Sequence, residues 1–214
     1  MLKKYKHISF DLDGTLVHTL PEYRHTLVAA VVRELGGVET PRDIDRFWFE
    51  PNRDKTIRDT FRLDPAAFWN LFQTQDTSEK RALHTHAYEE AERTLRKLKG
   101  LDKTISIITG APEWIAAMEI EKLNKAPVDF YCSTHHHKFP DKPDPQSFFF
   151  VLSRLGMQPQ DTLYIGNSSE DAGLAKNAGA DFIYLERKEH EFDQEEYALA
   201  TVHSLEEIFT LGSR

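Results

Sequence analysis

Short apolar runs recur along this chain of 214 residues, and patterns typical of helices lie between them. We expect buried strands in five segments, at residues 7–10, 104–108, 128–132, 162–165 and 182–185. Strands that alternate with helices form right-handed crossovers and a mostly parallel sheet. The chain is therefore predicted to be an α/β protein with a doubly wound, Rossmann-like sheet. In such sheets, ligands bind beyond the carboxyl ends of the strands.

The segment between the first two expected strands has helical character throughout. Apolar side chains recur every three or four residues from Leu20 to Leu35, and Asp64-Pro65 is a typical start of another helix. This segment shows no strand pattern, so we expect an all-α subdomain at residues 18–90, inserted into a core of residues 1–17 and 91–214. The alternative is a structural extension of the helical layer around the sheet.

Composition narrows the classes of partner that this protein can have. The net charge of −8 argues against nucleic acid or an anionic membrane as a partner. The only cysteine, Cys132, excludes an internal disulfide and fits a reducing compartment. No apolar run approaches the roughly 20 residues that a bilayer requires, and no apolar stretch follows the basic start as in a signal peptide. We therefore expect a soluble, cytoplasmic protein.

The first expected strand ends in a pair of carboxylates, in the run Asp11-Leu12-Asp13-Gly14-Thr15. Side chains alternate along a strand, so Asp11 and Asp13 would point the same way. Two such charges repel unless a cation lies between them or one carboxylate holds a proton. Compact oxygen ligands suit Mg²⁺, a hard cation used with phosphate substrates. The alternative is an Asp-Gly turn that merely leaves a strand.

Three more polar motifs follow in order, at residues 109–110, 142–145 and 166–171. Together with the first, they resemble the haloacid dehalogenase-like superfamily, in particular its phosphatase branch. That family's pattern is D-x-D-G-T, a Thr or Ser that closes a strand, a Lys, and a Gly-Asp stretch that ends in an acid. The resemblance covers nearly the whole chain, although the segment at residues 18–90 matches in kind rather than in residues.

The resemblance implies catalytic roles for four residues. Asp11 would be the nucleophile, forming an aspartyl-phosphate that water later hydrolyses. Asp13 would be the general acid and base, and an acid at this position separates phosphatases and phosphomutases from dehalogenases. Thr109, with the amide of Gly110, would bind a phosphoryl oxygen, and Lys142 would neutralise charge on the nucleophile and the phosphoryl group. A strand-closing threonine and a solvated loop lysine are the structural alternatives.

The same resemblance implies an Mg²⁺ site formed by Asp11, Asp13, Asn167 and Asp171. The family commonly has an acid at the position of Asn167, and that acid is often a direct metal ligand. An amide oxygen can also coordinate Mg²⁺, but it supplies no charge. We therefore expect a weaker affinity for Mg²⁺ than in a relative with aspartate at this position.

Substrate selection is implied to lie partly in the inserted segment, which resembles the helical cap that closes over the active site in this superfamily. The residues expected to bind substrate are Gly14, Thr15, Gly110, Arg53 and Lys55. A solvated helix face would explain Arg53 and Lys55 equally well.

The sequence thus predicts an Mg²⁺-dependent phosphatase that acts on a small phosphorylated metabolite. One alternative is a phosphomutase of the same superfamily, which uses the same two aspartates. Another alternative is a member of the superfamily that binds a phosphorylated ligand without turnover. Asn167 is the only residue that favours it. Neither the substrate's identity nor the oligomeric state can be predicted from these residues.

Overall fold

The computed structural model describes residues 1–189 and 197–212. The chain divides into two compact units. The α/β unit contains Met1–His18, His86–Lys188 and the described residues of the C-terminal segment, 197–212. The helical unit contains Thr19–Thr85. The chain therefore leaves the α/β unit after His18 and re-enters it at His86.

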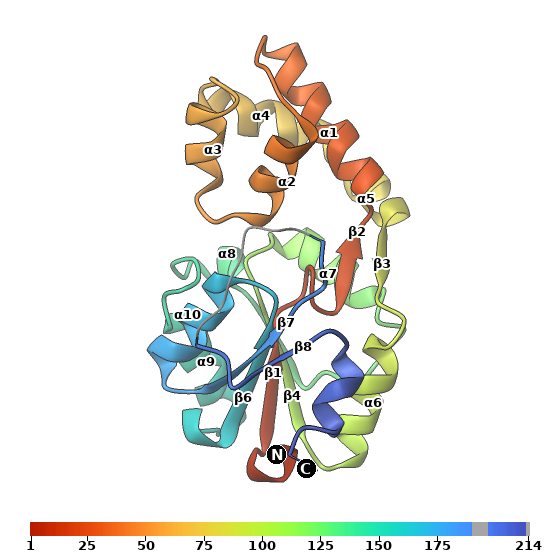
Figure 1. Ribbon diagram of the computed structural model, residues 1–214, viewed down its shortest axis with the longest axis vertical. Helices are drawn as coiled ribbons and strands as arrows, with labels where there is room; N and C mark the ends of the chain where they lie inside the picture. Colours follow the sequence, from red (N-terminus) through yellow and green to blue (C-terminus); the bar gives the residue numbers. More distant parts are fainter. Residues whose placement is uncertain (190–196, 213–214) are drawn as a thin grey trace. The chain divides into compact units, whose positions relative to one another are not determined.

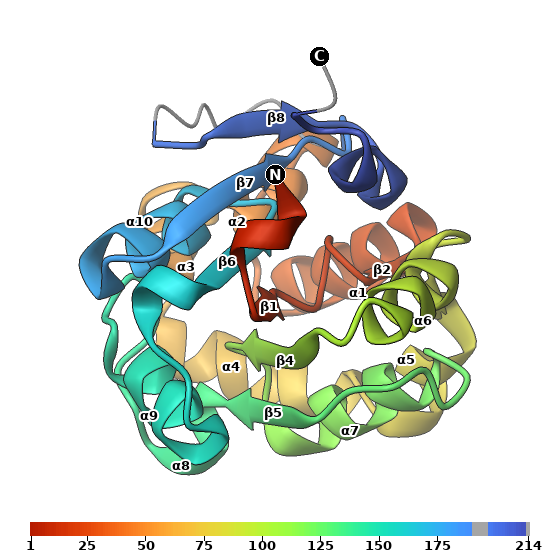
Figure 2. The same cartoon turned by 90° about the horizontal axis from the view of Figure 1, so that it is seen from below.

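A six-stranded parallel sheet organises the α/β unit (Figure 1). Its strand order is β5-β4-β1-β6-β7-β8, which can be followed in Figure 2. Its strands are β1 (His7–Phe10), β4 (Thr104–Thr109), β5 (Phe130–Ser133), β6 (Thr162–Gly166), β7 (Asp181–Leu185) and β8 (Ala200–Val202). All four residues of β1 are buried, because this strand lies between β4 and β6. The predicted parallel, doubly wound sheet is confirmed.

Helices cover both faces of this sheet, as Figure 2 shows. They are α6 (Ala91–Gly100), α7 (Glu113–Glu121), α8 (Thr134–His137), α9 (Gln146–Leu155) and α10 (Ser169–Ala178), with short 3₁₀ turns at Leu2–Lys4, Pro159–Asp161 and Leu205–Phe209. Successive strand residues point to opposite faces. Accordingly, Ile107 belongs to the core under α6, whereas its neighbour Ile108 belongs to the core under α9 and α10.

The helical unit consists of α1 (Pro21–Glu34), α2 (Pro41–Phe49), α3 (Arg53–Asp59), α4 (Pro65–Gln75) and α5 (Ser78–His84). Aromatic rings dominate its own core, where Phe47 packs against Phe61 and Phe68. Capping side chains mark helix starts in this unit. Asp64, for example, accepts a hydrogen bond from the amide of Ala67 and caps α4.

A two-stranded ribbon, β2 (Val17–Thr19) and β3 (Thr85–Ala87), contains both points at which the chain passes between the units. The sequence predicts no strand in the inserted segment, so this ribbon corrects the expectation of an all-α insertion. Strands of three residues are too short to establish an alternating pattern. Within residues 1–189 and 197–212, no helix has the length and apolar character needed to cross a membrane.

Candidate active site

Asp11 lies where β1 ends, and its amide still donates to the carbonyl of Ile165 in β6 at 2.9 Å. The chain then turns tightly, because the carbonyl of Leu12 accepts the amides of residues 15, 16 and 17. Gly14 has φ +80°, and a Cβ at this position would overlap the side-chain amide of Asn167. Glycine therefore allows the turn and its close approach to Asn167.

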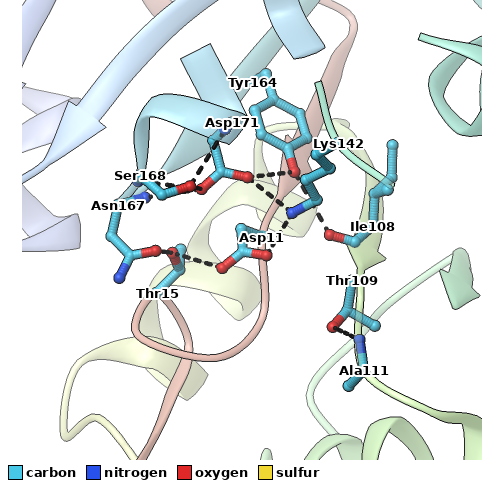
Figure 3. A network of polar contacts seen from close by, with 10 residues as sticks. All are labelled: Asp11, Thr15, Ile108, Thr109, Ala111, Lys142, Tyr164, Asn167, Ser168 and Asp171. Atoms are coloured by element: carbon cyan, nitrogen blue, oxygen red, sulfur yellow. Dashed lines mark hydrogen bonds and ion pairs between the residues drawn. The ribbon is translucent and has the colours of Figure 1, made fainter. Parts of the chain in front are cut away.

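The ammonium of Lys142 joins two carboxylates at the centre of the site (Figure 3). Its Nζ lies 2.6 Å from Oδ1 of Asp11 and 2.7 Å from Oδ1 of Asp171. All three side chains are largely buried, with Asp171 only 1% exposed. The hydroxyl of Tyr164, on β6, lies 3.2 Å from the same oxygen of Asp171. Two residues predicted from separate motifs, Asp11 and Lys142, are thus in direct contact.

The loop that carries Lys142 is held by α10. A Cβ on Gly173 would come within 2.6 Å of the ring of Pro143, so only glycine allows this close packing. Asn177 also donates to the carbonyl of Pro143 at 2.9 Å. These contacts place the neighbouring Lys142 at the carboxyl end of the sheet.

Asp171 is saturated by protein donors. Ser168 begins α10 in a capping box with Asp171, and Oδ2 of Asp171 accepts the amides of Asn167 and Ser168 and the hydroxyl of Ser168. Its other oxygen accepts Lys142 and Tyr164. A direct metal bond would have to displace one of these donors. In the structure, Asp171 contacts Lys142 and forms the capping box at the start of α10.

Thr15 links the loop that follows Asp11 to Asn167 of the fourth motif. Its hydroxyl lies 3.3 Å from Oδ2 of Asp11 and 3.3 Å from Oδ1 of Asn167. One hydroxyl has one proton, so it donates to these two oxygens alternately. The two oxygens therefore face the same point, beside a loop that also contains Asp13, which is half-buried.

Carboxylate and amide oxygens at this point fit Mg²⁺, which prefers oxygen ligands and retains several waters. Among residues 1–189 and 197–212, no group of three His, Cys, Asp or Glu side chains could hold a metal ion. This agrees with a neutral amide at Asn167 and with the engagement of Asp171 by protein donors. The site therefore offers an ion few charged ligands.

Burial and charge set the protonation of the central groups. Burial raises the pKa of Asp11, and the nearby charge of Asp171 adds to the shift while Lys142 opposes it. Burial alone would lower the pKa of the Lys142 ammonium, but the two carboxylates raise it well above its ordinary value. Lys142 is therefore a fixed positive charge, and a cation near Asp11 would favour the ionised, nucleophilic form of that carboxyl.

The remaining predicted site residues lie outside the network of Asp11, Lys142 and Asp171. Thr109 ends β4, next to β1, and its hydroxyl accepts the amide of Ala111 at 3.1 Å, apart from the Asp11 cluster in Figure 3. Gly110 follows it and is exposed. Arg53 and Lys55 are exposed residues of α3 in the helical unit, and Arg53 donates to the carbonyl of Trp48. These two residues belong to the helical unit, whereas Asp11 belongs to the α/β unit.

Sequence reasoning missed Tyr164. A tyrosine in a buried strand is expected to be part of the hydrophobic core, and no motif includes its hydroxyl. The signal that could have found it is its polar oxygen, which needs a partner when buried.

The family model of haloacid dehalogenase-like hydrolases matches residues 8–185. A phosphoglycolate phosphatase of Pseudomonas putida is 30% identical over 83% of this chain and 68% of that protein. (S)-2-haloacid dehalogenase 4A of Burkholderia cepacia is 25% identical over 99% of this chain and 96% of that protein. The solved structure of a HAD family hydrolase from Deinococcus radiodurans R1, with bound phosphate and sodium, has a TM-score of 0.74 at 19% identity and covers 96% of this chain and 93% of that one.

Proposed function

Because this chain belongs to the haloacid dehalogenase-like hydrolases, we propose that it is an Mg²⁺-dependent phosphatase of small phosphomonoesters. The observation that carries the proposal is the contact between Asp11 and the ammonium of Lys142 at the carboxyl end of β1. A carboxylate beside a fixed positive charge can approach an anionic phosphoryl group, because the charge offsets their repulsion. The phosphoglycolate phosphatase of Pseudomonas putida, which is 30% identical, supports the same class of reaction.

In the proposed reaction, Asp11 attacks phosphorus while the bond from phosphorus to the leaving oxygen breaks. Asp13 donates its proton to that oxygen, which leaves as an alcohol. Asp13 then accepts a proton from water, which attacks the aspartyl-phosphate and releases inorganic phosphate and the Asp11 carboxylate. Lys142 neutralises negative charge at Asp11 and at the phosphoryl oxygens, and Thr109 with Gly110 donates to one of those oxygens.

Asp13 is also why we prefer a phosphatase to a dehalogenase, although one relative is a haloacid dehalogenase. A halide leaves as a stable anion and needs no proton, whereas an alkoxide is a poor leaving group without one. A second acid two residues after the nucleophile therefore suits phosphoester chemistry.

Bound Mg²⁺ would supply positive charge that screens the phosphoryl group from Asp11. Asp11, Asn167 and the backbone carbonyl of Asp13 would hold it. Asp171 would support the ion indirectly, because its oxygens already accept protein donors. Thr15 and Gly14 would shape the loop that receives the phosphate.

We propose further that residues 18–90 form a cap that selects the substrate, with Arg53 and Lys55 as candidates for binding an anionic tail. Small phosphorylated metabolites remain the proposed partners, rather than nucleic acids or membranes. The single cysteine, Cys132, is free, and a chain without an internal disulfide fits a cytoplasmic location.

The test is release of inorganic phosphate from a panel of phosphomonoesters that begins with phosphoglycolate. Each compound is assayed with Mg²⁺ and with chelator, using Asp11→Asn as the blank. We expect release that requires Mg²⁺ and disappears in the variant. Poor release that a sugar bisphosphate stimulates would instead favour a phosphomutase. No release from any compound by folded protein would contradict the proposal.

A further inference from the structure

Arg187 follows β7 and has three partners in the α/β unit. Its Nη1 lies 2.6 Å from Oε1 of Glu90, and its Nη2 donates to the carbonyl of Thr15 at 2.8 Å. The guanidinium also lies 3.6 Å from the centre of the Tyr88 ring. The side chains of Arg187 and Glu90 are only 9% and 12% exposed. None of the four sequence motifs includes this arginine.

These partners come from both segments through which the chain leaves and re-enters the α/β unit. Thr15 precedes β2, whereas Tyr88 and Glu90 follow β3. The amide of Tyr88 donates to the carbonyl of Leu16 at 3.0 Å, so the two segments are also bonded directly. His18, the last residue before the helical unit, stacks on the Tyr88 ring at 4.7 Å. Arg187 therefore joins both connecting segments at one point.

The same arginine reaches the reaction centre through one residue. Arg187 holds the carbonyl of Thr15, and the hydroxyl of Thr15 contacts Oδ2 of Asp11 and Oδ1 of Asn167. Thr15 is thus fixed on its backbone side by Arg187 while its side chain lies between the nucleophile and the fourth motif. A shift of this carbonyl would move the hydroxyl and the attacking carboxylate with it.

The geometry points to Arg187 as a positioning residue of the phosphatase reaction proposed above, acting on Asp11 through Thr15. A planar guanidinium is required, because it donates in two directions while it stacks on an aromatic ring. A lysine would supply a single point charge and could not keep all three contacts. Glu90 fixes the guanidinium in turn, and the pairing lowers the pKa of Glu90 despite its burial.

The experiment compares Arg187→Met and Arg187→Lys with a matched control, Arg93→Met. Arg93 pairs with Glu206 on the same unit, but both side chains are more than half exposed. We expect both Arg187 variants to lower kcat about tenfold or more and to change KM by less than about threefold, because the nucleophile is misplaced while substrate contacts remain. The control keeps the wild-type kcat.

A double-mutant cycle with Thr15→Val tests whether Arg187 acts on Asp11 through Thr15. If Arg187 acts through Thr15, the two losses in kcat are much less than additive in the double variant. Additive losses, or a folded Arg187→Met enzyme with wild-type kcat, would overturn the inference. Where Arg187→Met does not fold, Arg187→Lys and Glu90→Gln carry the same comparison, and wild-type kcat in both overturns it.

Amide hydrogen exchange gives a readout that does not need turnover. Arg187→Met should increase exchange in residues 11–19 and 85–90, whereas Arg93→Met should leave both segments unchanged. Unchanged exchange in Arg187→Met would overturn the inference even if the wild type showed no phosphatase activity. Absence of wild-type activity on every phosphomonoester would contradict the proposed function alone.

Discussion

Lys142 donates a 2.6 Å hydrogen bond to Oδ1 of Asp11, across 131 positions of sequence. The contact joins the end of the central strand to the loop that Gly173 and Asn177 of α10 hold in place. It also explains how two carboxylates, Asp11 and Asp171, can be buried together, since one ammonium serves both. The proposed chemistry depends on this shared charge.

Replacing Lys142 should remove that charge with little change in shape. We expect Lys142→Met to lower kcat at least about 100-fold, because the charge that favours attack on phosphorus is lost. The melting temperature should also fall, since Asp11 and Asp171 lose their partner. Lys176→Met, at an exposed position on α10, is the control. A Lys142→Met enzyme with near wild-type turnover would be incompatible with the mechanism.

Asn167→Asp should lower the stability of the metal-free protein and raise its affinity for Mg²⁺. The new carboxylate would lie near Asp11, so like-charge repulsion should lower the melting temperature in chelator. With an added charged ligand, the Kd for Mg²⁺ measured by calorimetry should fall roughly tenfold. Equal or weaker Mg²⁺ binding in the variant would remove Asn167 from the proposed metal site.

A comparison of Gly14→Ala with Gly179→Ala distinguishes backbone strain from steric overlap with the site. Both Gly14 (φ +80°) and Gly179 (φ +74°) are in the left-handed region, so alanine at either should cost about 1 kcal/mol of stability. Only at Gly14 would the Cβ overlap Asn167, whereas the space around Gly179 is open. We expect Gly14→Ala to lose Mg²⁺ affinity and turnover, and Gly179→Ala to retain both. Equal retention of both properties in Gly14→Ala would argue against the close approach.

The sheet could be predicted from the sequence because its strands are buried on both faces and appear as continuous apolar runs. The five expected strands correspond to β1, β4, β5, β6 and β7; the bounds of β1 coincide, and the ends of the others differ by at most two residues. The short strand β8 was missed for the same reason as the ribbon, since three residues carry no periodic signal. Helix starts with a proline, such as α4, were also predictable.

The site was predictable only as a set of residues. Asp11 and Lys142 were expected to act together. The short distance between them, however, depends on how α10 packs against the loop that carries Lys142. Some of the hydrogen bonds that engage Asp171 belong to the capping box with Ser168, which the sequence does not distinguish from a metal site. Others come from Lys142 and Tyr164, which lie outside the fourth motif. Tyr164 and Arg187 have no motif, because their roles depend on neighbours that are distant in sequence. The catalytic and binding roles stay predictions.

His7 should make stability depend on pH. It lies within β1, 2.8 Å from the hydroxyl of Ser106 and 3.1 Å from that of Thr162, and burial lowers its pKa to about 4. The unfolded chain protonates this histidine near pH 6.5, so between these values the unfolded state binds more protons. Stability should therefore fall as the pH drops, by about 3 kcal/mol for this residue by pH 4.

Urea unfolding of the wild type and His7→Leu at pH 7 and pH 4.5 measures this effect. The variant should lose clearly less stability between the two conditions than the wild type. His135→Leu, which removes an exposed histidine of α8, controls for the loss of one imidazole. The same decrease with pH in wild type and His7→Leu would show that other groups cause it.

The central claim is that Asp11 forms the covalent intermediate, and label transfer tests it most directly. The enzyme is mixed with Mg²⁺ and p-nitrophenyl phosphate that contains radioactive phosphorus, quenched in acid during turnover, and digested for peptide mapping. We predict label on the peptide that contains Asp11, more of it in Asp13→Asn because hydrolysis of the intermediate is slowed, and none in Asp11→Asn. Label on a different residue, or undiminished phosphate release by Asp11→Asn, would contradict the account.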